Sequence, residues 1–423
     1  TGKWYWECYP RTLGGTQQYG IVPASHFFAA DGDYPSNDGV NGYAYLNTGQ
    51  KSSNDSAADY GDSFTTGDLI GVAYDADNRL LYFYKNNTIQ DSGTAAYTVA
   101  VNEYIPAVGT YGNGAIGKFN FGQDSSFDGV ATGQNNPDGN GIGDFTYTPP
   151  SGYLALCTKN LPEPAVIPQE NFNAFLFDDG EGAKTGIGFA PDFLWFKARD
   201  AAANDHQLYD SIRGVENNLL SNTDVAEGDA STGLTAFGSD GFTIGTDNAV
   251  RNTTGSGMVV WNWKAGGGAS SVGSNTDGSI NTTDTSVNVD AGFSMSTYTG
   301  TGSAATVGHG LSKKPEMIMI KRRDDAGGWR IFHDANAANY HLVLSTVAAR
   351  ATSSSIFNNT EPTSSLFTVG GGGSVNASSG TYIAYAFHSV DGYSKVGSYI
   401  GNGSQQGPFI NTGFRPAWIM VKS

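Results

Sequence analysis

The chain has 423 residues, a length that predicts two to four domains, because a single domain rarely exceeds about 250–300 residues. Hydrophobic residues make up 39% and aromatic residues 12%, there are 58 glycines, and only 15% of residues are charged, which is typical of an all-β protein with many tight turns and uncharged loops. The net charge of −17 argues against nucleic acid and anionic membrane surfaces as partners, and no apolar run approaches the ~20 residues that span a bilayer.

The two cysteines, Cys8 and Cys157, are too few for a disulfide framework. No spacing of cysteine and histidine indicates a zinc site. We interpret the pair as two buried thiols, with a single bridge between them as the alternative.

The N-terminal third reads as short strands joined by turns. In "KWYWECY", Trp4 and Trp6 share one face of a strand and Tyr5 lies on the other. Further along, "GDLIGVAYDADNRLLYFYKNN" predicts a hairpin with strands at 69–74 and 80–85. Asp and Asn suit the turn between them, because their side chains bond the local backbone.

Four segments of this region resemble, in order, the signatures of a SPRY domain. They are "GKWYWE" at 2–7, "GDLIGVAYDADNRLLYFYKN" at 67–86, "YIPAV" at 104–108 and "NFGQ" at 120–123. The resemblance implies a bent β-sandwich of two sheets that acts as a binding module through the loops at one end. SPRY domains share no catalytic residues, so the resemblance assigns none here.

A long stretch at 29–63, rich in Gly, Asp, Asn and Ser, carries the candidate ligand-binding residues Tyr34, Tyr43 and Tyr45. Tyrosine offers a flat apolar face and a hydroxyl, which suits contacts with sugar or protein. The alternative is that these rings pack the loop onto the sandwich.

The connector that follows contains a candidate calcium loop. Asn136, Asp138, Asn140 and Asp144 match positions 1, 3, 5 and 9 of such a loop, but Tyr147 occupies position 12, where a bidentate Glu is needed. The alternative is a Gly/Asn/Asp-rich turn without metal. Calcium is the one cofactor considered, and otherwise none is expected.

The connector also carries a resemblance. A segment "GYLALCTKNLPEP" after a SPRY unit is similar to that in uncharacterised virion proteins of tailed bacteriophages. We therefore expect a SPRY-like β-sandwich plus connector at 1–157, ending in a linker rich in proline.

The remainder repeats one unit. "PDFLWFKARD" at 191–200 returns as "PEMIMIKRRD" at 315–324 and as "PAWIMVKS" at 416–423. The first two copies stay in register at a constant offset, from Pro191 and Pro315 (315 − 191 = 124) to Trp261 and Tyr385 (385 − 261 = 124). Such an offset over some seventy residues indicates a duplicated domain. These repeats also resemble those of structural proteins of marine tailed phages.

We place the C-terminal domains by this repeat. The expected parts are a β-sandwich repeat at 171–268, a linker without apolar periodicity at 269–291, a second β-sandwich repeat at 292–390, and residues 391–423. The last segment is either the start of a third unit or the closing hairpin of the second. The fold class is thus all-β: a SPRY-type β-sandwich followed by two or more repeated β-sandwich domains.

Within each copy of the motif, both faces of the strand are apolar, whereas a sandwich strand with one wet face should alternate with polar residues. We therefore predict that the outer face is covered by another domain or another copy of the chain. The predicted assembly interface consists of Phe193, Trp195, Met317, Met319 and Trp418.

The sequence indicates no catalytic site. Asp178 and Asp179 are strand neighbours and would point to opposite faces, and His206 lacks a histidine in the matching position of the second repeat. Arg199 and Asp200 recur as Arg323 and Asp324, which is read as a salt-bridged turn, with a bound ligand as the alternative.

These patterns favour a non-enzymatic structural and adhesion protein of a bacteriophage virion, in a tail fibre, tail-associated adhesin or decoration component. Its expected partners are copies of itself (as a homo-oligomer, with a trimer by analogy to phage fibres), other virion proteins, and a host-surface glycan or protein, without membrane insertion. The alternatives are a tail-associated glycan hydrolase and a bacterial surface or filament adhesin.

Overall fold

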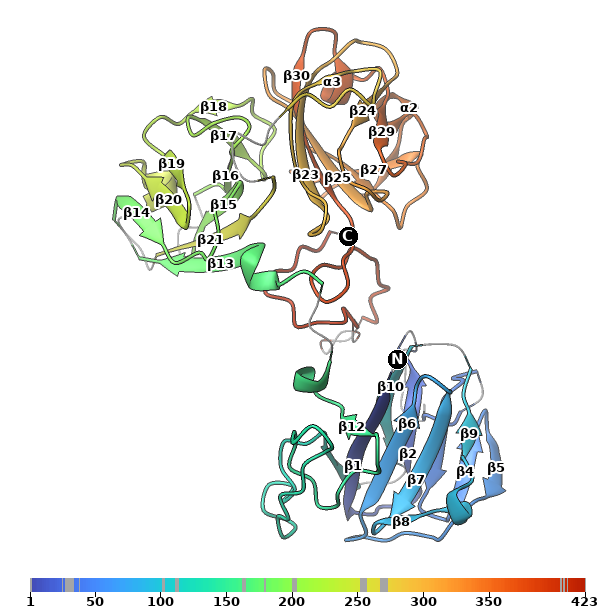
Figure 1. Ribbon diagram of the computed structural model, residues 1–423. Helices are drawn as coiled ribbons and strands as arrows, with labels where there is room; N and C mark the ends of the chain where they lie inside the picture. Colours follow the sequence, from blue (N-terminus) through green and yellow to red (C-terminus); the bar gives the residue numbers. More distant parts are fainter. Residues whose placement is uncertain are drawn as a thin grey trace. The chain divides into compact units, whose positions relative to one another are not determined.

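The structure, a computed structural model, describes residues 2–24, 26, 34–37, 39–100, 103–110, 114–161, 165–178, 180–199, 204–251, 257–266, 273–403, 405, 408 and 410–422. It forms two compact units (Figure 1). Unit 1 comprises Thr1–Pro162 with Ile400–Asn411, and unit 2 comprises Glu163–Tyr399 with Thr412–Ser423. No helix among the described residues is long and apolar enough to cross a membrane.

Unit 1 is a sandwich of two mainly antiparallel sheets. The first has the order β11-β1-β6-β7-β8, with β12 parallel to β1 and β9 beside β7, and the second has the order β10-β2-β3-β4-β5. The elements are β1 Lys3–Thr12, β2 Gln17–Pro23, β3 Tyr43–Leu46, β4 Gln50–Ser53, β5 Ser56–Asp59, β6 Ile70–Asp75, β7 Leu80–Lys85, β8 Thr88–Ile89, β9 Tyr97–Thr98, β10 Tyr104–Thr110, β11 Ile116–Asn120 and β12 Leu154–Ala155, with short 3₁₀ turns at Asp91–Gly93 and Thr158–Asn160.

The alternating pattern of β1 separates two cores. Trp6 lies between the two sheets with Tyr45 and Phe83, whereas Tyr5 points to the outer face of the first sheet and packs on Phe145 of the connector, with ring centroids 5.3 Å apart. The predicted hairpin is present as β6 and β7, closed by the pairing of Asp75 with Leu80. The connector thus covers the face that a sandwich alone would leave exposed.

Unit 2 contains two sandwiches of similar topology. The first half has a large sheet β13-β21-β15-β16-β17-β18 and a small sheet β14-β20-β19, and the second half has a large sheet β22-β23-β30-β25-β26-β27-β28 and a small sheet β24-β29. The first half contains β13 Phe172–Phe177, β14 Gly182–Thr185, β15 Phe193–Ala198, β16 Gln207–Asp210, β17 Asn217–Leu220, β18 Gly228–Asp229, β19 Leu234–Gly238, β20 Gly241–Ile244, α1 Asn248–Arg251 and β21 Met258–Trp263, preceded by a 3₁₀ turn at Pro168–Glu170.

The second half contains β22 Thr282–Asn288, β23 Phe293–Thr299, β24 Ala305–Gly308, β25 Met317–Arg322, β26 Arg330–His333, β27 Tyr340–Val343, β28 Ala351–Thr352, α2 Ser354–Phe357, β29 Leu366–Val369, α3 Gly373–Asn376 and β30 Thr381–Phe387. One expectation is wrong here. The stretch 269–291 was expected to be a linker, but β22 lies within it and pairs with β23. Its buried positions are Thr282, Thr285 and Ser286, which a search for apolar periodicity misses.

The repeat offset is not constant through the structure. Trp195 pairs with Trp261 as Met319 pairs with Tyr385, an offset of 124 (319 − 195 = 124). On the next strand, Trp195 pairs with Leu208 and Met319 with Ile331, an offset of 123 (331 − 208 = 123). The turn after β25 is therefore one residue shorter than the turn after β15, and the structural counterpart of Asp210 is His333, not Asp334.

Residues 391–423 match neither expectation fully. The described residues of this segment form no strand, and an isolated bridge joins Val390 to Ser394. Trp418 nevertheless packs against three tryptophans of the first half, with ring centroids 5.2–6.4 Å apart. The segment therefore adds side chains to unit 2 without adding a hairpin.

The two halves of unit 2 meet through the outer faces of their large sheets. One apolar cluster contains Phe193, Trp195 and Trp263 of the first half together with Met319 and Tyr385 of the second. The small sheets cover the opposite faces through separate clusters. Unit 2 therefore has four layers, and its two large sheets are both buried on two faces.

A buried ion network lies at the edge of this interface. The Arg213 guanidinium is fully buried and donates to Asp210 at 2.6 Å and to Glu227 at 2.9 Å. Tyr385 of the other half donates its hydroxyl to Asp210 at 2.6 Å, and Arg323 of the other half binds both oxygens of Glu227 at 2.8–2.9 Å. Burial alone would lower the pKa of Arg213, but the surrounding acidic groups outweigh it and raise that pKa.

Replacing Arg213 with Met should destabilise unit 2 strongly. Asp210 and Glu227 would then lose a buried counter-ion, and breaking a buried pair in this way costs about 3–5 kcal/mol. The unfolding transition of unit 2 in urea measures the loss. Lys313→Met, at an exposed cation of the same unit, is the control and should change the midpoint little. Equal effects of the two substitutions would contradict a stabilising role for the network.

Candidate functional site

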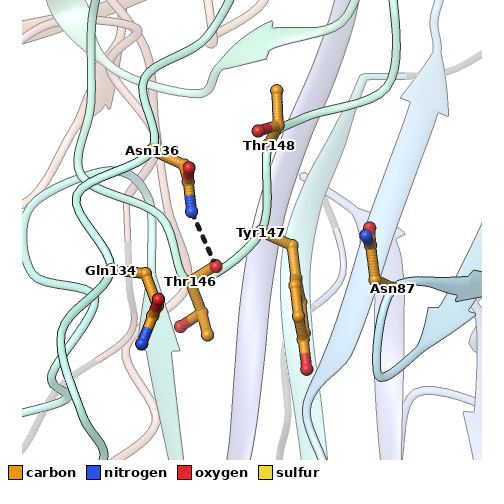
Figure 2. A pocket seen from close by; sticks show the side chains of 6 residues that line it. All are labelled: Asn87, Gln134, Asn136, Thr146, Tyr147 and Thr148. Atoms are coloured by element: carbon orange, nitrogen blue, oxygen red, sulfur yellow. Dashed lines mark hydrogen bonds between the residues drawn. The ribbon is translucent and has the colours of Figure 1, made fainter.

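A polar pocket of about 390 Å³ opens on unit 1, beside the connector. Figure 2 shows Asn87 on the turn between β7 and β8, whereas the other lining residues come from the connector. The pocket is lined by Asn87, Gln134, Asn136, Thr146, Tyr147 and Thr148. Every lining residue is an amide, a hydroxyl or a tyrosine, so the pocket offers hydrogen bonds and one aromatic ring but no charge.

Buried Glu7 positions the connector side of this pocket. From β1, its carboxylate accepts the backbone N–H groups of Thr146 and Tyr147, both at 2.9 Å. Asn120 donates its side-chain amide to the same carboxylate at 3.3 Å. Two of the pocket residues are thus held at the backbone by one acidic side chain of the sandwich, which pre-organises the pocket before any ligand arrives.

Burial raises the pKa of Glu7, although the two backbone donors oppose this shift. The side chain is fully buried, so its charge is separated from water. Burying a carboxylate costs free energy. Here both of its oxygens accept hydrogen bonds from neighbouring backbone N–H groups, which offsets part of that cost.

The expected calcium loop is organised around Asp138. One carboxylate oxygen accepts the N–H groups of Asn140 and Ile142 at 2.8 and 3.0 Å, and the other accepts those of Ala155 and Asn160 at 2.8 and 2.6 Å. Burial would raise the pKa of Asp138, but these donors lower it below its ordinary value. Both oxygens therefore already serve as acceptors within the protein.

The other members of the calcium loop do not gather around Asp138 as ligands. Asn136 donates its amide to Thr146 at 2.8 Å, Asn140 donates to Asn160 at 2.9 Å, and Asp144 has its backbone N–H bonded to Gly122 at 2.9 Å. In the described residues, no group of three His, Cys, Asp or Glu side chains is placed to hold a metal ion. Calcium at this loop remains a prediction from the sequence.

The three tyrosines predicted to bind a ligand all contact the sandwich. Tyr45 is fully buried, stacks on Phe83 with centroids 5.3 Å apart and donates its hydroxyl to the carbonyl of Asp62, so its assignment to ligand binding is wrong. Tyr43 packs on Tyr97 at 4.8 Å. Tyr34 lies half-buried against Gly109 of β10. The alternative that these rings pack the loop against the sandwich describes them better.

A second hollow of about 300 Å³ lies elsewhere on unit 1. Its walls include the aromatic residues Trp4, Tyr74 and Tyr104, with Glu103 as a carboxylate. Tyr74 and Tyr104 meet edge to face, with centroids 6.2 Å apart. Both cysteines of the unit are free thiols, with Cys8 buried and Cys157 half-buried.

The predicted assembly interface lies inside unit 2. Phe193 is 0% and Trp195 6% exposed, while Met317 is 9% and Met319 1% exposed, all within the cluster between the two halves. Trp418 packs half-buried on the same cluster. The face is covered as expected, but by the other repeat of the same chain, so these side chains are not available to a second copy.

The charged residues that recur between the repeats serve as ion pairs in the second half. Arg322 binds Asp324 at 3.0 Å and holds its pKa at about 2, and Arg323 binds Glu227. Asp200 and Asp179 lie outside the described residues. His206 accepts the indole N–H of Trp195 at 2.8 Å, and burial lowers its pKa, so it is placed as a packing residue beside the interface.

Sequence reasoning did not find most of the pocket. Asn87, Gln134 and Thr148 are exposed polar residues without a motif, and they meet only through tertiary structure. The one available signal was Glu7, an acidic residue within the strand "KWYWECY", whose alternation places it on the same face as Tyr5.

Comparison with known proteins agrees with this division of the chain. Residues 3–124 match the SPRY domain family, and the N-terminal sandwich is a SPRY domain. The chain belongs to the family described as a domain of unknown function (DUF7483), whose model matches residues 168–423. No curated protein matches the chain.

Two solved human structures are similar to the SPRY part. A human SPRY domain is 20% identical, with 27% of this chain and 74% of that chain covered and a TM-score of 0.23. The SPRY domain of human HERC1 is 19% identical, with 28% and 74% covered and the same TM-score of 0.23.

The contribution of Glu7 to the stability of unit 1 should fall as pH rises from about 4.5, the ordinary pKa of glutamate. Because the folded state raises the pKa of Glu7, it binds this proton more tightly than the unfolded chain, and the stabilising effect is lost as the group ionises. Urea unfolding between pH 4 and 7 measures the slope. Glu7→Gln should remove this contribution, and an unchanged slope in that variant would show that Glu7 is not its source.

Proposed function

We propose that the protein is an adhesion protein of a bacteriophage virion, in which the SPRY unit binds a host-surface ligand and unit 2 is a rigid scaffold for assembly. The observation that carries the binding role is the uncharged pocket that Glu7 fixes at Thr146 and Tyr147. The virion setting rests on the likeness of the connector and repeats to phage structural proteins.

The lining residues favour a neutral glycan as the ligand. Amide groups both donate and accept hydrogen bonds, hydroxyl groups do the same, and a tyrosine ring offers an apolar face to the C–H side of a sugar. A charged ligand would find no counter-ion among the lining residues. The net charge of −17 additionally disfavours anionic polymers.

Unit 2 supports the mechanical half of the proposal. Its two sandwiches share one apolar cluster, and hydrogen bonds cross between them from Trp329 to Leu220 at 2.8 Å and from Gly327 to Asp224 at 2.6 Å. A pair fixed in this way transmits force as one body, which suits a protein that must hold a particle to a surface.

Binding of the full chain to a panel of neutral surface glycans tests the ligand. Tyr147→Ala should weaken the best binder at least ~10-fold, equivalent to about 1.4 kcal/mol, because the aromatic face of the pocket is lost. Thr148→Ala should also weaken it. Thr132→Ala changes an exposed threonine of the connector that does not line the pocket and should leave affinity unchanged. Equal affinities across the three variants would contradict this site.

A reducing-sugar assay on the same glycans separates adhesion from hydrolysis. We expect binding without cleavage. Cleavage that stops when one carboxylate is removed would replace the proposal with the tail-associated hydrolase. Detection of the chain in purified intact phage particles tests the virion setting, and its presence on bacterial filaments instead would favour the bacterial adhesin.

A further inference from the structure

The outer edge of β13 differs from the same edge in the second repeat. β13 pairs with β21 as β23 pairs with β30, and Ala174 lies opposite Trp261 as Met295 lies opposite Tyr385. Because the repeat aligns Trp261 with Tyr385, β13 and β23 are equivalent strands. In the second repeat, β22 pairs with the far side of β23. In the strand order of the described residues, the first repeat has no equivalent of β22, and β13 is the last strand of its sheet.

Half of the backbone groups of β13 face this outer edge. The N–H of Lys264 donates to the carbonyl of Asn171 at 3.0 Å, and the bonds between antiparallel strands recur at every second residue. The odd-numbered residues of β13 therefore bond to β21, and the N–H and C=O groups of Phe172, Ala174 and Leu176 point away from the sheet. A further strand would find a regular row of donors and acceptors there.

β13 carries none of the features that usually protect an edge strand from pairing. Its sequence, FNAFLF, has neither the charge nor the proline that commonly blocks an edge. By contrast, β22 contains Asp284, and β18 and β28, at the opposite edges of the two large sheets, are only two residues long. Leu176 is 57% exposed, whereas the equivalent Thr297 is 3% exposed. Among these edges, β13 is therefore the best suited to accept another strand.

We propose that β13 of a second copy of this chain fills this edge, by antiparallel pairing of the two β13 strands across a twofold axis. The strand that fills the equivalent edge, β22, is antiparallel to β23 and has seven residues, against six in β13. A twofold axis reverses the direction of a strand, so a strand that pairs with its own copy across the axis does so in the antiparallel sense. The two large sheets then join into one continuous sheet.

The sequence of β13 allows a self-complementary register. With Phe175 of both copies on the axis, Ala174 of each copy lies opposite Leu176 of the other. The outward-facing backbone groups of the two strands then meet and exchange hydrogen bonds, and the two apolar side chains contact each other across the ladder. Asp178, just beyond the strand, lies opposite Phe172, so this carboxylate does not face another acidic group.

This inference goes beyond the proposed function, because it rests on strand pairing and exposure in unit 2 alone. Failure to bind any glycan would leave the dimer unaffected. Loss of the dimer would equally leave the pocket of unit 1 intact. The two proposals can therefore fail separately.

Analytical ultracentrifugation of the full chain tests the contact over about 1–100 µM, a range suited to a small interface. The wild type should form a dimer. Ala174→Lys combined with Leu176→Lys should make the chain monomeric, because it places lysines directly opposite each other across the axis. Both positions are exposed, so urea unfolding of unit 2 should stay unchanged. Val347→Lys combined with Ala349→Lys adds the same charges at the same spacing on exposed positions and should remain dimeric.

A charge-swapped variant tests the register. Ala174→Glu combined with Leu176→Lys places a carboxylate opposite an ammonium group at both pairs, and it should restore the dimer that the double lysine variant loses. The proposal is overturned by a dimer that survives the double lysine variant, by a control pair that is equally monomeric, or by a charge-swapped variant that stays monomeric. A wild type that is monomeric throughout the range would overturn it as well, and would leave the edge to a strand of another protein.

Discussion

Unit 2 depends on the ion pairs that the buried Arg213 guanidinium makes with Asp210 and Glu227. The guanidinium belongs to the first repeat, yet the Asp210 carboxylate it neutralises also accepts the hydroxyl of Tyr385 from the second. The apolar cluster supplies most of the burial energy between the repeats but fixes no orientation. The ion network adds directional bonds that are satisfied only when both halves are in place, so it selects one arrangement of the two sheets.

In unit 1, buried acidic side chains hold a loop, the connector, in place through hydrogen bonds. The connector has little regular structure, and its order comes from two carboxylates, Glu7 and Asp138, that accept its backbone N–H groups. A SPRY sandwich ends before this segment, at residue 124 of the family match. The pocket is therefore an addition to the SPRY scaffold, built by anchoring a Gly- and Asn-rich stretch on the outer face of the first sheet.

The sequence predicted the framework of the fold better than the site. The strict alternation of side chains in β1 and in the β6–β7 hairpin predicted which residues face each of two cores. The motif at 191–200 is apolar on both faces of its strand, so it predicted that both faces are buried. The strand β22 was missed because its buried positions are threonine and serine. Tyr45 was misassigned, since an aromatic ring between small residues looks alike in a binding loop and in a core. The pocket depends on contacts between segments far apart in sequence, which no local pattern encodes.

The turn after β25 is one residue shorter than the turn after β15. It places His333 where the first repeat has Asp210, and Asn336 stands where the first has Arg213. The two halves contribute different groups to the network: the first supplies Asp210, Arg213 and Glu227, and the second supplies Tyr385 and Arg323. Two copies of either half could not reproduce this interface. The two halves of unit 2 therefore form a pair of unlike partners, and the residues of the network must change together for their ion pairs to remain satisfied.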